Sequence, residues 1–424
     1  MPPPVTLRNP YHDAFLRQKY GGDDFIPLSL GETGNGPPEG LLAALRQVTA
    51  DSHGYTLDPY GLPVLHHTLR TYITEAHGLD SVATLGVDYE VAASEASTRN
   101  TMFQFGRLLL EGSHGTPTLV CSSPGWDYAG VFGALGFEIR TFPVLPEQEY
   151  QPAVSEFADV LGRARRDSAD GPLLVALNVQ HNPTGANWEA GAVREMVRSA
   201  IDAGASILVD DAYYAVHDAG ITPTSALSIL LSELRDTPPH RRPLWAGVRS
   251  MGKQFGCNGW GIGATTGPPD VVEALRTRLL PQYSYVSATP LQAAMAAWLK
   301  NPASDAYLAQ QQEEYTEKRR LVGRLLSENL GYPAEAYSVG TCGAYMLMRT
   351  PPWYTRRGGG LDFREYVVSR TRVLLGEAFM TTPGMPLRDS HGYVRLFLGQ
   401  PRALLAEALE RLTTGGFTWA EPGL

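Results

Sequence analysis

The sequence has few cysteines and no long apolar run. Only Cys121, Cys257 and Cys342 occur among 424 residues, and their spacing predicts neither a disulfide framework nor a zinc site. A chain of this kind fits a reducing cytoplasm, which is where we expect it. No apolar run reaches the roughly 18 residues that a membrane-spanning helix needs. The N-terminus also lacks the charged and apolar regions of a signal peptide, so we expect no membrane partner.

Basic residues are in deficit as well. Lysine and arginine total 35 against 44 aspartates and glutamates, which gives a formal net charge of −9. Proteins that bind nucleic acid need a basic face, so we expect no nucleic-acid partner. Three histidines, His66, His67 and His181, have no metal-ligand spacing. We therefore expect no metal site and assign these histidines structural or solvated positions.

One lysine lies in a glycine-rich turn. Residues 250–263 read Ser-Met-Gly-Lys-Gln-Phe-Gly-Cys-Asn-Gly-Trp-Gly-Ile-Gly and follow a strand-like run over residues 243–250. Small neighbours allow Lys253 to lie against a flat cofactor with its amine desolvated. Desolvation lowers the pKa of a lysine and makes the amine nucleophilic, as Schiff-base chemistry requires. A lysine in such a turn is more often an ordinary solvated residue, so the motif needs support from other segments.

Three upstream segments supply that support. The apolar run over residues 173–177 leads into Asn-Val-Gln-His-Asn-Pro-Thr-Gly, which contains Asn182. A second apolar run ends at Asp210, with Tyr213 three residues later, and a third leads through a turn to Trp126. Open α/β sheets bind ligands at the carboxyl ends of their strands, and an indole can stack on a flat ring.

Together and in this order, these segments resemble the class I/II aminotransferases, which are fold-type I enzymes that use pyridoxal 5'-phosphate (PLP). The resemblance extends to residues 26–32 (Ile-Pro-Leu-Ser-Leu-Gly-Glu), 55–63 (Tyr-Thr-Leu-Asp-Pro-Tyr-Gly-Leu-Pro), 343–348 and 393–396. It implies an α/β fold: a large domain with a mostly parallel sheet flanked by helices, plus a smaller α+β domain. It also implies a homodimer with shared active sites.

The resemblance and the patterning together predict a domain division. Residues 1–50 should form an N-terminal arm and part of the small domain, and residues 51–300 the large PLP-binding domain. Residues 301–424 should form a connecting helix and the C-terminal small domain. Strand and helix patterns alternate from about residue 85 to residue 290, as a parallel sheet flanked by helices requires. Apolar residues at helical spacing over residues 304–330 predict a long connecting helix.

Catalytic roles follow from the resemblance. It implies that Lys253 forms the Schiff base with PLP and then moves the Cα proton of an α-amino acid. It implies that Asp210 keeps the pyridine nitrogen protonated, and that Asn182 and Tyr213 bind the 3-oxygen of the ring. Trp126 would stack on the ring.

The resemblance also implies roles in binding phosphate and substrate. Thr98 and Arg99 lie in the turn before a helical pattern, where unpaired amides could bind an anion, and Ser250 lies three residues before the lysine. Tyr55 would reach the phosphate of the neighbouring subunit. Arg395 would hold the substrate carboxylate, with a structural salt bridge as the other possibility. Gly31 and Asn182 would also face the substrate.

Two positions depart from the family pattern. Gly261 stands where relatives carry the arginine that grips the phosphate, and Gly252 stands where they commonly carry serine. Two accounts of Gly261 are open. Either Arg99 supplies the missing cation, or Gly261 makes room for a large substrate while amides, hydroxyls and the helix dipole hold the phosphate.

The resemblance favours aminotransfer as the reaction. The alternative is a PLP-dependent elimination, replacement or cyclisation enzyme of specialised biosynthesis, for example one acting on S-adenosylmethionine as aminocyclopropane-carboxylate synthase does. The departures at Gly252 and Gly261 favour that alternative. A regulator built on this fold is disfavoured because the match begins near Ile26, leaving little chain for a DNA-binding domain.

Overall fold

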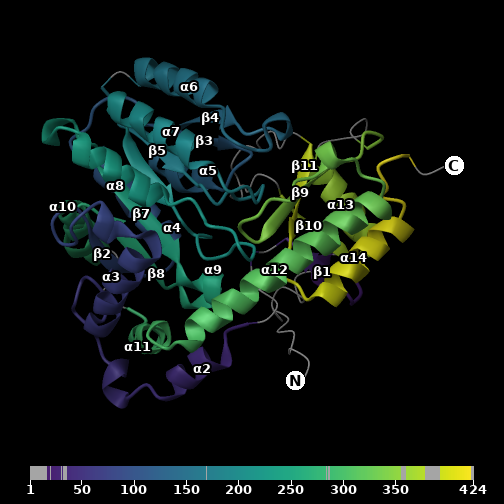
Figure 1. The fold of residues 1–424 in the computed structure, drawn as a ribbon, viewed down its shortest axis with the longest axis horizontal. Helices are drawn as coiled ribbons and strands as arrows, with labels where there is room; N and C mark the ends of the chain where they lie inside the picture. Colours follow the sequence, from purple (N-terminus) through teal and green to yellow (C-terminus); the bar gives the residue numbers. More distant parts are fainter. Residues whose placement is uncertain are drawn as a thin grey trace.

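The computed structural model describes residues 17–19, 21–29, 31, 36–168, 170–282, 284, 287–354, 360–377 and 392–421, with no side-chain description for residues 360–362. Residues 1–16 of the expected arm, and Leu30 and Glu32 of the motif near Gly31, lie outside these ranges. The described part contains a seven-stranded and a four-stranded sheet (Figure 1).

The seven-stranded sheet is mostly parallel. Its order is β2 (Glu90–Ser94), β8 (Gly263–Gly267), β7 (Trp245–Ser250), β6 (Ser206–Asp210), β5 (Leu173–Leu177), β3 (Thr118–Ser123) and β4 (Glu138–Pro143). Strand β8 is antiparallel to both neighbours, and the other pairs are parallel. All five residues of β5 are buried, as expected for a strand covered on both faces. The predicted α/β fold with a mostly parallel sheet is confirmed.

Alternate residues of each strand face opposite layers of helices. Val175 and Leu177 join one core cluster, and Leu174 and Ala176 join another. The first cluster includes residues of α3 (Pro63–His77), α6 (Val154–Asp167), α7 (Ala190–Asp202), α8 (Ala226–Asp236) and α11 (Thr289–Leu299). The second includes residues of α4 (Thr98–Leu110), α5 (Tyr128–Phe132) and α10 (Pro269–Glu273).

The four-stranded sheet joins the two ends of the chain. Its order is β1 (Ile26–Leu28), β10 (Val373–Glu377), β11 (Tyr393–Phe397) and β9 (Tyr345–Arg349). Strand β1 pairs in parallel with β10, and the other pairs are antiparallel. Helices α13 (Gly360–Thr371) and α14 (Arg402–Thr414) contribute to the core cluster of this sheet. The first strand of the chain is therefore held by a strand that follows it by more than 300 residues.

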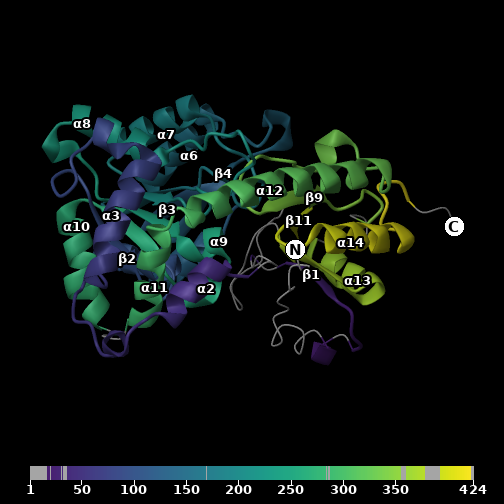
Figure 2. The same cartoon turned by 60° about the horizontal axis from the view of Figure 1, so that its bottom comes forward.

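The long helix expected over residues 304–330 is present as α12 (Ala303–Glu328). Figures 1 and 2 show it running from the side of α11 and of α9 (Met251–Phe255) to α14. Helix α2 (Glu39–Arg46) packs against α11. The boundaries expected near residues 50 and 300 stay a prediction. None of the helices in the described ranges is both long and apolar enough to cross a membrane.

Candidate active site

A cavity of about 310 Å³ lies at the carboxyl ends of β5, β6 and β7. Most of the residues proposed from the sequence line it, although they come from segments far apart in the chain. They are Gly31, Thr98, Trp126, Asn182, Asp210, Tyr213, Ser250, Lys253 and Arg395. Since β5, β6 and β7 run in parallel, their carboxyl ends meet at one edge of the sheet, where α/β folds bind ligands.

Lys253 reaches the cavity from the short helix α9, directly after β7. The Ser250 hydroxyl caps this helix by accepting a hydrogen bond from the Lys253 main-chain N–H at 3.3 Å. The Lys253 amine donates to the carbonyl oxygen of Gly31 at 3.2 Å, and the Asn258 amide donates to the same oxygen at 2.9 Å. A main-chain carbonyl thus holds the amine, and no ion pair to a carboxylate of the described residues binds it.

Asp210 is buried at the end of β6 and is 3% exposed. Its carboxylate accepts hydrogen bonds from the Tyr128 hydroxyl at 2.7 Å and from the Ala212 main-chain N–H at 3.2 Å. Burial raises the pKa of Asp210 to about 6, although both hydrogen bonds and the charge of Lys253 lower it in part. A buried carboxyl with a raised pKa favours a ligand that brings a positive charge.

Arg395 is buried on β11 and is 3% exposed. Its guanidinium donates to the Asn182 side-chain oxygen at 3.1 Å and to the Ser29 carbonyl at 2.9 Å. Its Nε has no hydrogen-bond partner among the described residues, and none of their carboxylates pairs with it. The structural salt bridge considered from the sequence is therefore not found in this part of the chain.

Sequence reasoning missed several residues of this site. Asn178 accepts from the Asn182 main-chain N–H at 2.7 Å and donates to the Asp210 carbonyl at 2.9 Å. The Tyr345 hydroxyl accepts a hydrogen bond from Tyr213 at 2.9 Å. Asn258 lies within the glycine-rich turn, but nothing in that turn distinguishes it from a surface residue. The one sequence signal for Asn178 was its position directly after the strand β5.

Two residues proposed from the sequence do not line the cavity. The Arg99 guanidinium donates to the Asp127 carboxylate at 2.9 Å and lies 4.6 Å from the centre of the Trp126 ring. It therefore lies against Trp126 and is held there by Asp127. Tyr55 is 80% exposed, and its expected contact with a neighbouring subunit stays a prediction.

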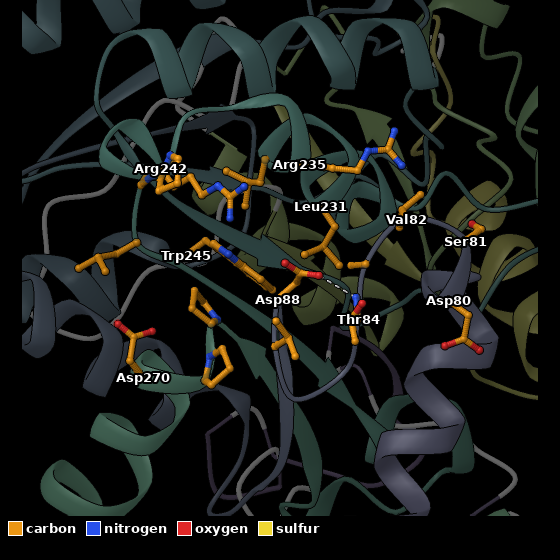
Figure 3. Close-up of a pocket in the computed structure, with 18 residues that line it drawn as sticks. Asp80, Ser81, Val82, Thr84, Asp88, Leu231, Arg235, Arg242, Trp245 and Asp270 are labelled. Atoms are coloured by element: carbon orange, nitrogen blue, oxygen red, sulfur yellow. Dashed lines mark hydrogen bonds between the residues drawn. The ribbon is translucent and has the colours of Figure 1, made fainter.

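A larger cavity of about 560 Å³ lies at the opposite end of the seven-stranded sheet (Figure 3). The start of β7 at Trp245 and the residue just after β8, Pro268, contribute to it. Figure 3 shows Arg235 and Arg242 on one side of it and Asp270 on the other. No lysine, histidine or cysteine of the described residues lines this cavity. Of the two cavities, the one at the carboxyl ends of β5, β6 and β7 is the one lined by a lysine, Lys253.

Comparison with known proteins agrees with this geometry. The family model for aminotransferase class I and II matches residues 23–412. The chain belongs to this family. A probable aspartate/prephenate aminotransferase of Thermus aquaticus is 24% identical over 414 residues, covering 97% of this chain and 96% of that protein. An aspartate aminotransferase of Pyrococcus horikoshii is 22% identical over 400 residues, covering 92% and 90%.

Solved structures share the fold of this class I/II family member. Aspartate aminotransferase from Thermus thermophilus with maleate superposes with a TM-score of 0.76 at 22% identity, covering 98% of this chain and 97% of that one. The substrate-bound BacF structure from Bacillus subtilis gives 0.79 at 18% identity, covering 98% and 96%.

The family departure at Gly261 lies against the start of α4. The Gly261 carbonyl accepts from the Ser97 main-chain N–H at 2.8 Å. Gly261 has a φ of +65°, and a β-carbon there would lie 3.2 Å from the same nitrogen. This glycine thus lets the two turns approach closely.

The departure at Gly252 has a packing reason. A β-carbon at this position would lie 2.8 Å from the Asn258 α-carbon and 3.1 Å from its nitrogen. Contacts this short involve main-chain atoms that cannot rotate away. Close approach of the turn therefore explains why serine is absent here, without any change in substrate.

We predict that Gly252→Ser destabilises the cofactor-free protein by about 1–3 kcal/mol, because the added atoms overpack the turn. Urea unfolding followed by circular dichroism measures the free energy of unfolding. Gly259→Ser is the matched control, since nothing lies within 4 Å of a β-carbon there. Equal losses in the two variants would contradict the packing explanation.

His181 is fully buried beside Asn182, between the Ser122 hydroxyl at 2.9 Å and the Thr184 hydroxyl at 2.7 Å. Burial lowers its pKa to about 3. In the unfolded chain this histidine takes up a proton with a pKa near 6.5, whereas in the folded protein it stays neutral until a much lower pH. The free energy of unfolding therefore decreases as the pH falls below about 6.5.

We predict that this site alone removes about 2 kcal/mol of stability between pH 7 and pH 5. The loss between these two pH values should be smaller by that amount in His181→Gln, whatever its stability at pH 7. Urea unfolding of both proteins at each pH measures the difference. An unchanged loss in His181→Gln would show that the histidine takes up a proton equally in the folded and unfolded states, which would contradict the lowered pKa.

Proposed function

We propose that this protein is a PLP-dependent aminotransferase acting on an α-amino acid, with Lys253 as the residue that binds the cofactor and moves the proton. The observation that carries the proposal is one cavity that combines a lysine amine, a buried carboxyl and a buried guanidinium. Each group lacks an ion-pair partner among the described residues, and each matches a different part of the cofactor and the substrate.

The side chains around the cavity fit the cofactor. The Lys253 amine suits the aldehyde, and the buried Asp210 carboxyl suits a protonated ring nitrogen, which supplies the positive charge it lacks. Trp126 offers a flat ring for stacking, and Asn182 and Tyr213 offer polar groups for the ring oxygen. Membership in a family of PLP enzymes supports the same assignment.

For the phosphate we propose the second of the two accounts drawn from the sequence. Thr98 and Ser250 line the cavity, and the N-terminal end of α4, which begins at Thr98, favours an anion through its helix dipole. Arg99 already pairs with Asp127 and lies against Trp126. We assign it to positioning Trp126 instead of replacing the family arginine absent at Gly261.

The chain's own residues divide the work of the reaction. Bound PLP supplies an electron sink that stabilises the negative charge left at Cα. With the cofactor bound, Lys253 would take up the Cα proton of the substrate as a general base, a role that accelerates reactions by about 10²–10⁴-fold. Arg395 holds the substrate carboxylate, since its Nε has hydrogen-bonding capacity to spare. Gly31 holds the amine of Lys253 at the cavity edge through its carbonyl.

We further propose a homodimer, a cytoplasmic location and the domain division at about residues 50 and 300. Tyr55 and Leu57 are each 80% exposed and lie two residues apart. Large exposed apolar side chains close together favour a protein interface, and a second copy of this chain is the partner we propose. Relatives named as aminotransferases favour transamination over the elimination, replacement or cyclisation alternative.

The decisive experiment mixes the PLP-loaded protein with a panel of amino acids, including S-adenosylmethionine, without a keto acid. We expect stoichiometric conversion of the cofactor to pyridoxamine phosphate, reversed by adding a keto acid, as followed by absorption and chromatography. Multiple turnovers with release of an elimination or cyclisation product would refute aminotransfer.

We predict that Lys253→Ala lowers the rate of this conversion by at least about 10²-fold, because the proton-moving amine is lost. Stopped-flow absorption measures the rate with protein supplied with excess PLP. Lys300→Ala is the matched control, since Lys300 is exposed at the end of α11. A rate within threefold of the unmodified protein in Lys253→Ala would remove this lysine from the mechanism.

A further inference from the structure

The two tyrosines of the cavity form a pair that the proposed chemistry uses only in part. Tyr213 follows β6 and Tyr345 begins β9, and both are buried. The Tyr213 hydroxyl donates to the Tyr345 hydroxyl at 2.9 Å. Their rings meet edge to face at 78°, with centroids 5.6 Å apart. Tyr345 has no role in the mechanism above.

The hydroxyl of Tyr345 lies beside the amine of Lys253. A β-carbon at Gly31 would lie 2.2 Å from the Tyr345 hydroxyl, 3.0 Å from the Lys253 amine and 3.2 Å from the Tyr213 hydroxyl. All three polar atoms therefore lie around the position that a β-carbon of residue 31 would take. Any larger residue at position 31 would occupy the space in which they meet.

The guanidinium of Arg395 lies over the ring of Tyr345. The guanidinium carbon lies 4.0 Å from the ring centroid, within the range of a cation–π interaction. The two terminal nitrogens of the same guanidinium donate hydrogen bonds to Asn182 and to the Ser29 carbonyl. Tyr345 thus contacts Arg395 through its ring and Tyr213 through its hydroxyl.

The groups around Tyr345 determine which of the two tyrosines keeps the proton of the hydrogen bond between them. Lys253 and Arg395 act on its hydroxyl from α9 and β11, and Tyr315 interacts with it from α12, whereas Arg319 of α12 donates to the main-chain carbonyl of Tyr345. Burial raises the pKa of Tyr345, but Arg395, Lys253 and the hydrogen bond from Tyr213 together hold it below its usual value. Burial raises the pKa of Tyr213 well above its usual value. The shared proton therefore stays on Tyr213.

We propose that Tyr345 is a positioning residue of this site, aligning Arg395 through its ring and Tyr213 through its hydroxyl. The proposal rests on the proposed function for its effect on turnover. Its two halves are separable, because phenylalanine keeps the ring and removes the hydroxyl, whereas leucine removes both.

The hydroxyl half is tested on the cofactor-free protein, without any reaction. Tyrosine ionisation is followed by absorption near the tyrosinate band as the pH rises. We expect one phenol to ionise at lower pH than the rest, and to be lost in Tyr345→Phe. Tyr332→Phe is the matched control, since it removes a buried hydroxyl that has no partner among the described residues. A Tyr345→Phe titration identical to that of the unmodified protein would overturn this half.

The ring half is tested by steady-state kinetics with an amino acid accepted in the panel experiment. We expect Tyr345→Leu to raise KM about tenfold, because Arg395 loses its aromatic support, while kcat changes less than threefold. Tyr345→Phe should keep KM within threefold of the unmodified protein and shift the pH profile of kcat/KM. If both variants lower only the melting temperature, Tyr345 is merely structural and the proposal is wrong.

A second comparison covers the case in which Tyr345→Leu does not fold. Tyr213→Phe and the double variant with Tyr345→Phe complete a double-mutant cycle on the pH profile. We expect the two changes to be non-additive, and additivity would overturn the pairing. If the protein proves not to be an aminotransferase, the titration of the cofactor-free protein still decides whether the phenols are paired.

Discussion

The central constraint on this structure is that unlike charges, two of them buried, line one cavity without an ion pair among them. Lys253, Asp210 and Arg395 line the same space, and each is held by uncharged groups: a carbonyl, a phenol and an amide. Burying charge without pairing is costly. The surrounding fold must therefore stabilise these groups, and ligands that complement them recover part of that cost.

Much of the fold was predictable because strand ends are visible in the sequence. Apolar runs ending at Leu177 and Asp210 identify buried parallel strands, and the polar residues that follow fall at one edge of the sheet. Lys253 was identified because glycines and a preceding strand surround it. The order of these segments carried the family resemblance, which the comparisons confirmed.

Other parts of the site were beyond the sequence because they depend on contacts between distant segments. Tyr345 reads as an ordinary core residue of a strand, and only the folded structure brings its hydroxyl to Tyr213, 132 residues away. Arg99 looked like a phosphate ligand from its place before a helix, but Asp127 lies close enough to hold it. Gly252 resembled a functional change, whereas main-chain proximity to Asn258 is sufficient to explain it.

The pairing of β1 with β10 has a consequence for how the chain is made. Gly31 follows β1, and the strands that hold β1 and carry Arg395 belong to the last part of the chain. During synthesis at roughly 5–20 residues per second, Lys253 leaves the ribosome on the order of ten seconds before Arg395 does. Throughout that interval the nascent protein has Lys253 but not the C-terminal strands that complete its cavity. Completion of the cavity is thus a late event in biogenesis, and a chain truncated before β11 would lack the side of the cavity that Arg395 lines.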